Sequence, residues 1–186
     1  HDGILHLGQL DALSVLLQGT VPGVQQEGGL AELPGLHRVL AAGTADRCNT
    51  MTIGWCQAGR LWGLQTCTVY VRPERYTYQF MEDQAYFTVS VLPKDMKNAM
   101  ALCGTKSGRD MDKIKECGLT VRTGAGGAPF FEEAELVLVC RTLYAQDLEP
   151  ACVLPAGEEK ILPSYGAKGG WHRAYTGEIV EAYSAK

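Results

Sequence analysis

Hydrophobic and polar residues alternate along most of the chain after residue 36, and a period of two is typical of β-strands. The alternating segments are rich in β-branched and aromatic residues, which favour strands. They predict seven strands, at 37–42, 49–57, 61–72, 85–92, 119–122, 134–144 and 173–183. Ala58-Gly59-Arg60 is predicted to be the tight turn of a hairpin between the second and third of them. The pattern therefore indicates a mainly β fold.

Helical spacing is confined to short segments. Residues 9–19 place leucines three and four positions apart and end at Gly19, which predicts a short amphipathic helix. Between the strands, proline and glycine positions predict small helices at 73–81, 94–102 and 108–117. Many short strands with few small helices favour a closed or nearly closed barrel, since closure removes unpaired strand edges.

The chain divides into two unequal parts. Residues 20–35 are rich in glycine, carry Pro22 and Pro34 and show little periodicity, so we expect a loop or surface arm. Residues 1–36 are thus predicted to be an N-terminal helix and Gly-rich arm. Residues 37–186 are predicted to be one folded domain, a size that can bury a substantial core.

Composition excludes several classes of protein. Hydrophobic residues make up 46% and charged residues 20% of the 186 positions, which is typical of a folded globular chain. The longest apolar runs are far shorter than the ~20 residues of a membrane span. A net charge of −4 gives no long-range attraction for nucleic acid, although a local cationic pocket for one phosphate is compatible with it.

The cysteines indicate a reducing compartment. There are seven, an odd number without a CxxC pair, and several lie inside apolar strand patterns. The first residues also lack the basic start and apolar centre of a secretion signal. We therefore expect reduced thiols and a cytoplasmic protein.

The strand at 61–72 carries the first set of candidate site residues. Alternation places Thr66, Thr68 and Arg72 on one face, together with Tyr70, and Val71 on the other. An ordinary solvent-facing strand would show the same hydroxyl-rich face. The neighbouring segment 49–52, Asn-Thr-Met-Thr, adds a second group of hydrogen-bonding side chains close to Trp55. Together the two segments could line a slot for a flat polar heterocycle.

The second set lies in the segment 103–113, Cys-Gly-Thr-Lys-Ser-Gly-Arg-Asp-Met-Asp-Lys. Ser107 is predicted to be a helix N-cap, with Asp110 three positions later as in a capping box. A helix N-terminus flanked by Lys106 and Arg109 could bind a phosphate dianion. Alternatively, the nearby aspartates satisfy the helix dipole and the two cations pair with them.

Other chemical motifs are absent from the sequence. The segment 124–129 lacks the third glycine of a dinucleotide-binding fingerprint and leads into Pro-Phe-Phe, so we interpret it as a turn. The segment 104–108 is not a P-loop. The four histidines are too scattered to indicate a metal site. No catalytic residue is assigned, and His172 is retained only as a weak candidate.

Residues 37–183 resemble the flavin reductase-like family of FMN-binding split barrels, which includes the flavoredoxin electron carriers. Six segments carry the resemblance in the same order: 42–55, 68–77, 86–90, 103–113, 131–136 and 172–178. The resemblance implies a mainly β fold, an FMN-binding split β-barrel with a few short peripheral helices. It also implies a homodimer with FMN in a groove at the subunit interface.

The resemblance further implies roles for individual residues. The flavin ring edge is expected at four consecutive residues of one strand, with a tryptophan as a wall: Asn49, Thr50, Met51, Thr52 and Trp55. The ribityl chain and phosphate are expected at Thr66, Thr68, Val71 and Arg72, joined by Lys106, Ser107 and Arg109. His172 is expected near the ring, from the same or the partner subunit.

The implied function is electron transfer from a reduced nicotinamide, NADH or NADPH, through FMN to an acceptor. The alternative is a flavoredoxin-like carrier that docks redox proteins and has no nicotinamide activity. A barrel that binds another small ligand without FMN is the third reading.

Overall fold

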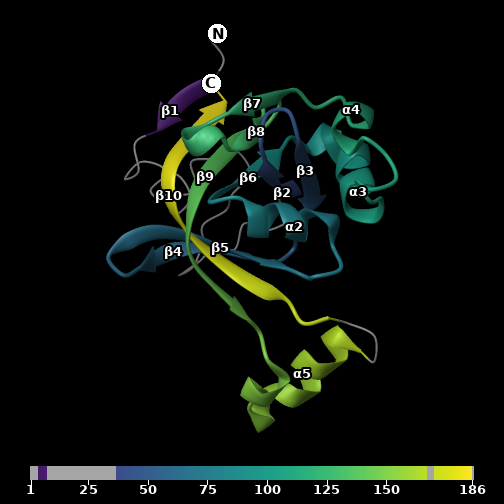
Figure 1. Ribbon diagram of the computed structural model, residues 1–186, viewed down its shortest axis with the longest axis vertical. Coiled ribbons are helices and arrows are strands. Elements are labelled where there is room, and N and C mark those ends of the chain that lie inside the picture. The colour runs from purple at the N-terminus through teal and green to yellow at the C-terminus, as the bar shows by residue number, and fades with distance from the viewer. Residues whose placement is uncertain (1–3, 8–36, 167–169, 186) are drawn as a thin grey trace.

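The computed structural model describes residues 4–7, 37–166 and 170–185. One antiparallel sheet runs in the order β3-β2-β6-β9-β10-β5-β4, with β1 paired to the end of β10 (Figure 1). The strands of this sheet are β1 (Ile4–Leu7), β2 (His37–Gly43), β3 (Cys48–Thr52), β4 (Cys56–Leu61), β5 (Leu64–Val71), β6 (Tyr86–Leu92), β9 (Leu136–Asp147) and β10 (Arg173–Ala185). A separate two-stranded ladder joins β7 (Val121–Thr123) to β8 (Pro129–Phe131).

The sheet curls around a buried core. Leu40 of β2, Val69 of β5 and Leu138 of β9 belong to one buried apolar cluster although their strands are far apart in the sheet order. Only a curled sheet can bring these side chains together. The end strands β3 and β4 are not neighbours in the sheet order, so the barrel is split rather than closed. This confirms the predicted mainly β split barrel.

Helices pack against both faces of the curled sheet, since Phe80 and Met81 of one helix belong to the barrel-core cluster and the other helices lie outside it. α2 (Tyr76–Asp83) lies against β2 and β3, and α3 (Lys97–Thr105) follows the 3-10 turn η1 (Lys94–Met96). A second apolar cluster joins Val39 of β2 and Val139 of β9 to Cys103 of α3 and Phe131 of β8. The short helix α4 (Lys113–Glu116) packs beside α3. The loop between α3 and α4 is therefore held at both ends by helices that are packed against the rest of the molecule.

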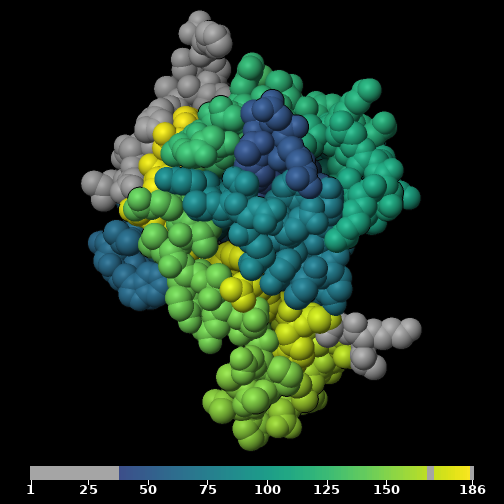
Figure 2. All heavy atoms as spheres, viewed as in Figure 1, coloured from purple at the N-terminus to yellow at the C-terminus, as the bar shows by residue number. Residues whose placement is uncertain are grey.

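An arm extends away from the barrel. β9 and β10 continue past the core and end in the 3-10 turn η3 (Pro150–Cys152) and the helix α5 (Pro155–Tyr165). Figures 1 and 2 show this arm as a separate lobe beyond the body of the molecule. Irregular register at Thr176/Gly177, between β9 and β10, marks a bend near the base of the arm.

Several sequence-based boundaries need correction. The strand expected at 49–57 is broken after Thr52, because the chain leaves β2 and starts β4 on the other side of the split. The hairpin turn lies at Trp62-Gly63 and not at 58–60, since these two residues take φ values of 54° and 77°, as a type I′ turn requires. The register pairs Ala58 with Cys67, so residues 58–60 are strand.

The helix expected at 108–117 is mostly a turn. α4 contains only Lys113–Glu116, and its N-cap is Asp112, whose side chain accepts a hydrogen bond from Lys115 N. Ser107 is not an N-cap; its side chain accepts from Arg109 N at 3.2 Å and so stabilises a local turn. The predicted capping box is wrong because aspartate at 112 caps the helix later in the chain.

Elements in the terminal and arm regions were not anticipated. The helix expected at 9–19 and the Gly-rich segment lie outside the described residues, whereas Ile4–Leu7 forms β1. Helix α5 and β8 were not predicted, because α5 lacks an apolar stripe and β8 has three residues. Within the part of the chain that the structure describes, no helix is both long and apolar enough for a membrane span.

Candidate functional site

The loop between α3 and α4 walls a small cavity of about 150 Å³ at the edge of the barrel. Asn49 and Met51 of β3 form its floor, and the segment from Glu74 to Thr77 forms a second side. Five of the sequence-predicted site residues line this cavity: Asn49, Met51, Lys106, Ser107 and Arg109. Segments that are far apart in the sequence thus meet at one hollow.

Lys113 is the most unusual residue of this cavity. It is only 5% exposed, and its ammonium donates a hydrogen bond to the carbonyl oxygen of Cys103 at 3.1 Å. Burial lowers the pKa of this lysine. An ammonium carries three donors, and a buried cation is costly unless an anion accompanies it. The geometry leaves room for an anionic ligand at Lys113.

Three further cations line the same cavity: Arg75, Lys106 and Arg109. The ion pairs formed by the described residues involve Arg122, Arg141 and Arg173, and none of them includes these cations or Lys113. Arg109 instead donates to the backbone oxygen of Glu74 and lies 4.9 Å from the Tyr76 ring centroid. The alternative that the loop cations pair with nearby aspartates is therefore wrong. Glu74 is the single carboxylate in the lining.

Close packing fixes the shape of the loop. A Cβ added at Gly108 would lie 2.1 Å from Asn49 Oδ1 and 3.0 Å from Tyr76 Cδ1, so only glycine fits. Asn49 is itself buried, and its side-chain amide donates to Thr77 Oγ1 at 2.8 Å. β3, α2 and the loop are thereby held in one arrangement before any ligand binds.

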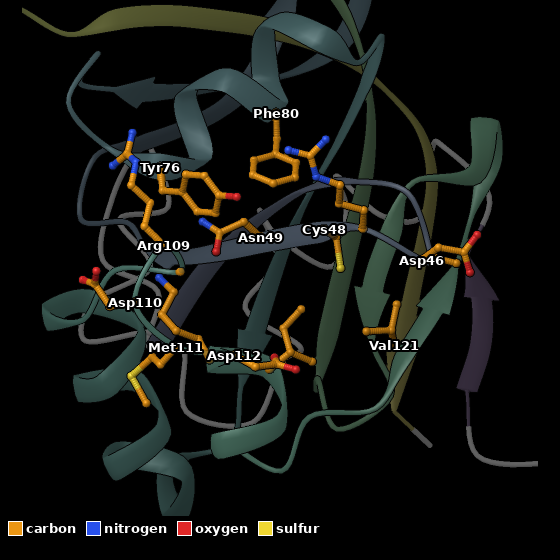
Figure 3. A pocket seen from close by; sticks show the side chains of 15 residues that line it. Asp46, Cys48, Asn49, Tyr76, Phe80, Arg109, Asp110, Met111, Asp112 and Val121 are labelled. Carbon is orange, nitrogen blue, oxygen red and sulfur yellow. The ribbon is translucent and has the colours of Figure 1, made fainter.

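A larger cavity of about 540 Å³ adjoins the first and shares Asn49, Tyr76, Gly108, Arg109 and Lys113 with it. Figure 3 shows Tyr76 and Phe80 reaching from α2 toward Asn49, with Cys48, Asp46 and Val121 on the far side. Three carboxylates also line it, those of Asp46, Asp110 and Asp112. Three cations, Arg47, Arg109 and Lys113, balance these carboxylates, whereas the smaller cavity has four cations and one carboxylate. The smaller cavity is therefore the better anion site.

Aromatic side chains form a second cluster at the base of the arm. Trp55 is 46% exposed, and its ring centroid lies 4.5 Å from His172 and 6.2 Å from Tyr165. Tyr165 stacks on Trp171 with centroids 3.9 Å apart. Burial, and secondarily the charge of Arg72, lowers the pKa of His172 to about 4. The imidazole is therefore neutral at pH 7.

Arg72 belongs to this aromatic cluster and not to the lining of either cavity. Its guanidinium donates to the carbonyl oxygen of Ser164 at 2.8 Å and lies 5.3 Å from the Tyr165 ring centroid. The two regions are joined through Glu74, whose carboxylate accepts from Gly170 N and whose carbonyl accepts from Arg109.

The remaining predicted site residues make internal contacts and line neither cavity: Thr50, Thr52, Thr66, Thr68 and Val71. Thr50 donates to Leu40 O, and Thr52 donates to Met100 O. Thr68 and Thr176 share a hydrogen bond of 2.9 Å across β5 and β10. The expected alternation of faces along β5 is correct, and Val71 lies in the core. The threonine hydroxyls of β5, however, form hydrogen bonds to neighbouring strands of the sheet.

Sequence reasoning missed Lys113, Arg75 and the arm aromatics as site candidates. Lys113 stood in the quoted segment 103–113, yet nothing in its spacing shows burial, because the helix expected there would have left it on an ordinary amphipathic face. Tyr165 and Trp171 come from a segment without predicted structure, and only tertiary packing brings them to Trp55.

The fold and the site together define a split-barrel protein with a cationic cavity at the barrel edge. Residues 32–186 match the family described as "Flavin reductase like domain", and the chain belongs to that family. The predicted family is therefore confirmed. No curated protein sequence matches the chain.

Solved structures show the same fold at low sequence identity. An FMN-binding domain of a flavin reductases-like enzyme from Shewanella baltica OS155 has a TM-score of 0.65 and 17% identity, over 97% of this chain and 76% of that one. Flavoredoxin from Methanosarcina acetivorans has a TM-score of 0.62 and 23% identity, over 87% and 74%. An NADH:FAD oxidoreductase from Streptomyces globisporus C-1027 has a TM-score of 0.57 and 17% identity, over 79% and 74%.

Proposed function

We propose that this chain is an FMN-binding oxidoreductase that passes electrons from a reduced nicotinamide through the flavin to an acceptor. The phosphate of FMN would lie in the smaller cavity, against Lys106, Ser107, Arg109 and Lys113. Family membership and the FMN-binding proteins among the structural neighbours support FMN as the cofactor.

One observation carries the phosphate assignment. Lys113 is buried with a single hydrogen bond, and three more cations without carboxylate partners in the described chain surround the same hollow. A phosphate dianion has the charge and the acceptor oxygens that this set lacks. Lys113 would neutralise one charge, while Lys106 and Arg109 contact the outer oxygens.

The flavin ring would lie toward Trp55. Glu74 lines the cavity, and its carboxylate accepts a hydrogen bond from Gly170 N, two residues before His172. A ligand that leaves the cavity past Glu74 therefore reaches the aromatic cluster. Trp55 offers an exposed indole, and His172 beside it is a neutral hydrogen-bonding group at pH 7. When bound, a flavin supplies hydride acceptance and one- or two-electron donation, and the chain positions it.

The residues of the chain need no nucleophile for this work. The preformed loop holds the phosphate end, the aromatic cluster walls the ring end, and the rest of the ring face is left for a nicotinamide or an acceptor. The NADH:FAD oxidoreductase among the structural neighbours supports nicotinamide as the donor. Flavoredoxin, also among them, supports the second candidate, a carrier that receives electrons from a redox protein.

Anaerobic mixing separates the two candidates. The protein is loaded with FMN, freed of excess flavin and mixed with NADH or NADPH while absorbance near 450 nm is followed. Bleaching within seconds is expected for the reductase. Bleaching by dithionite but by neither nicotinamide would instead establish the carrier, and failure to retain any FMN would reject both.

We also propose a homodimer in the cytoplasm. Large apolar side chains are exposed in two places. Trp62 of the β4–β5 hairpin lies beside Tyr144 of β9, which follows Leu143, and the arm exposes Leu154, Ile161 and Leu162. Exposed apolar groups of this size favour a protein interface. Light scattering after gel filtration should give twice the chain mass of 20.2 kDa, and a monomer mass would contradict the proposal. All seven cysteines are free thiols, which supports a reducing compartment.

A further inference from the structure

Two cysteines lie side by side at the two ends of the loop that walls the cationic cavity. Cys103 is in α3, Cys117 caps the C-terminus of α4, and their sulfur atoms are 3.6 Å apart. Cys103 is 1% exposed, whereas Cys117 is partly exposed. Both pack in the apolar cluster beneath the loop.

The segment between these cysteines contains most of the cavity's cationic groups, Lys106, Arg109 and Lys113. Lys113 is also fixed to this pair directly, because its ammonium donates to the carbonyl oxygen of Cys103. A bond between the two sulfur atoms would therefore close a ring that contains the loop, its cations and the hydrogen bond that orients Lys113.

We propose that Cys103 and Cys117 form a reversible disulfide that locks the loop and makes FMN retention depend on the thiol redox state. This proposal depends on the proposed function, because it takes FMN as the ligand of the cavity. The sulfurs need to approach by about 1.5 Å to reach disulfide length. Because this shift is small and the loop already has its cavity-forming shape, the lock reduces loop freedom without removing the site.

A small-molecule disulfide such as oxidised glutathione is the oxidant. The thiolate of Cys117, the more exposed residue of the pair, attacks one glutathione sulfur, and the glutathione S–S bond breaks with release of one glutathione thiolate. The Cys103 thiolate then attacks the Cys117 sulfur and displaces the second glutathione. Two electrons pass from the cysteines to the oxidant, and the two thiol protons end on the released glutathione.

A second close pair does not compete for this role. Cys56 and Cys67 have sulfurs 3.5 Å apart, but they are diagonal neighbours in the β4–β5 ladder. Cys67 has no exposed surface and lies in the barrel core, within strands paired on both sides. Joining these sulfurs would require the sheet to shift, whereas Cys103 and Cys117 belong to helical segments outside the sheet.

The test uses the full chain, incubated without flavin in oxidised glutathione or in dithiothreitol. Peptide mapping by mass spectrometry without reduction should find the peptides of Cys103 and Cys117 joined, and dithiothreitol should separate them. Titration with FMN, followed by flavin fluorescence, should give a Kd at least about threefold lower for the oxidised protein, with slower flavin release.

Two variants make the test specific. Cys117→Ser should bind FMN with the reduced wild-type affinity under both conditions. Cys152→Ser, which removes an exposed cysteine of the arm, should keep the full response. Absence of the joined peptides, or a disulfide that leaves FMN affinity unchanged or weaker, would overturn the inference. If Cys117→Ser and reduced wild type do not bind FMN at all, the proposed function fails and the inference fails with it.

Discussion

The cationic cavity and the aromatic cluster are joined through Glu74 but are built differently. In the cavity, cations face a hollow and lack carboxylate partners among the described residues, and Lys113 is buried there. In the aromatic cluster, the groups already satisfy one another: Arg72 bonds to Ser164 O, and Tyr165 stacks on Trp171. The cations of the cavity thus lack an anionic partner in the described part of the chain, whereas the polar and aromatic groups of the cluster have partners within it. This difference supports our proposal that the phosphate of FMN binds in the cavity.

The largest expected effect on FMN affinity comes from a substitution at Gly108, where the loop between α3 and α4 packs closely against Asn49. Gly108→Ala would put a methyl group against Asn49 Oδ1, so the loop must move. We expect at least a tenfold loss of FMN affinity and a loss of about 1–3 kcal/mol in the free energy of unfolding. Titration and urea denaturation measure the two quantities.

Gly54→Ala is the matched control, because a Cβ at that exposed position meets nothing within 4 Å. It should leave FMN affinity unchanged. Equal FMN affinity in Gly108→Ala and Gly54→Ala would show that the shape of the loop does not matter to the ligand.

A smaller effect on FMN affinity is expected from Arg72→Ala, which tests the aromatic cluster. Because this guanidinium bonds to α5 and lines neither cavity, its removal should lower stability by about 1 kcal/mol and change FMN affinity less than about threefold. Proteolysis of the arm should become faster. A tenfold loss of FMN affinity without a loss of riboflavin affinity would instead place the phosphate at Arg72, where the sequence resemblance put it.

The smallest effect on FMN binding is expected from a change of pH, which acts on the stability of the fold. His172 has a pKa lowered to about 4 in the folded chain, against about 6.5 when unfolded. Between pH 6.5 and pH 4 the imidazole is protonated in the unfolded chain but neutral in the folded chain. The free energy of unfolding should therefore fall as pH drops from 6.5 toward 4. His172→Gln should flatten this part of the curve. NMR titration of the imidazole checks the cause, and a pKa near 6.5 in the folded protein would contradict it.

Patterns along the chain predicted the barrel because strand alternation is local. Val39, Leu40 and their counterparts in other strands show it without any knowledge of the fold. Local patterns failed where a tertiary contact decides the outcome. The turn at Trp62 requires an uncommon φ for a tryptophan, and the early end of β3 is set by the split of the barrel.

The candidate site was predicted in the same uneven way. Ser107, Lys106 and Arg109 were grouped from their chemistry, and they do meet Asn49 and Met51 at one cavity. The reason given, a helix N-terminus, is wrong, since the helix starts at Lys113. The spacing of residues along the chain does not show whether a lysine is buried or whether a threonine hydroxyl bonds within the sheet. Both depend on contacts between segments that are far apart in the sequence.

The most direct test of the phosphate assignment compares FMN with riboflavin, which lacks the phosphate, in Lys113→Met and Lys115→Met. Lys115 lies two residues away on α4 and is exposed, so its variant removes the same charge from outside the cavity. Lys113→Met should weaken FMN binding about tenfold or more, leave riboflavin binding unchanged and leave the flavin-free protein no less stable. Lys115→Met should bind both as the wild type does. Equal FMN affinity in the two variants, or an equal loss for FMN and riboflavin in Lys113→Met, would contradict the account.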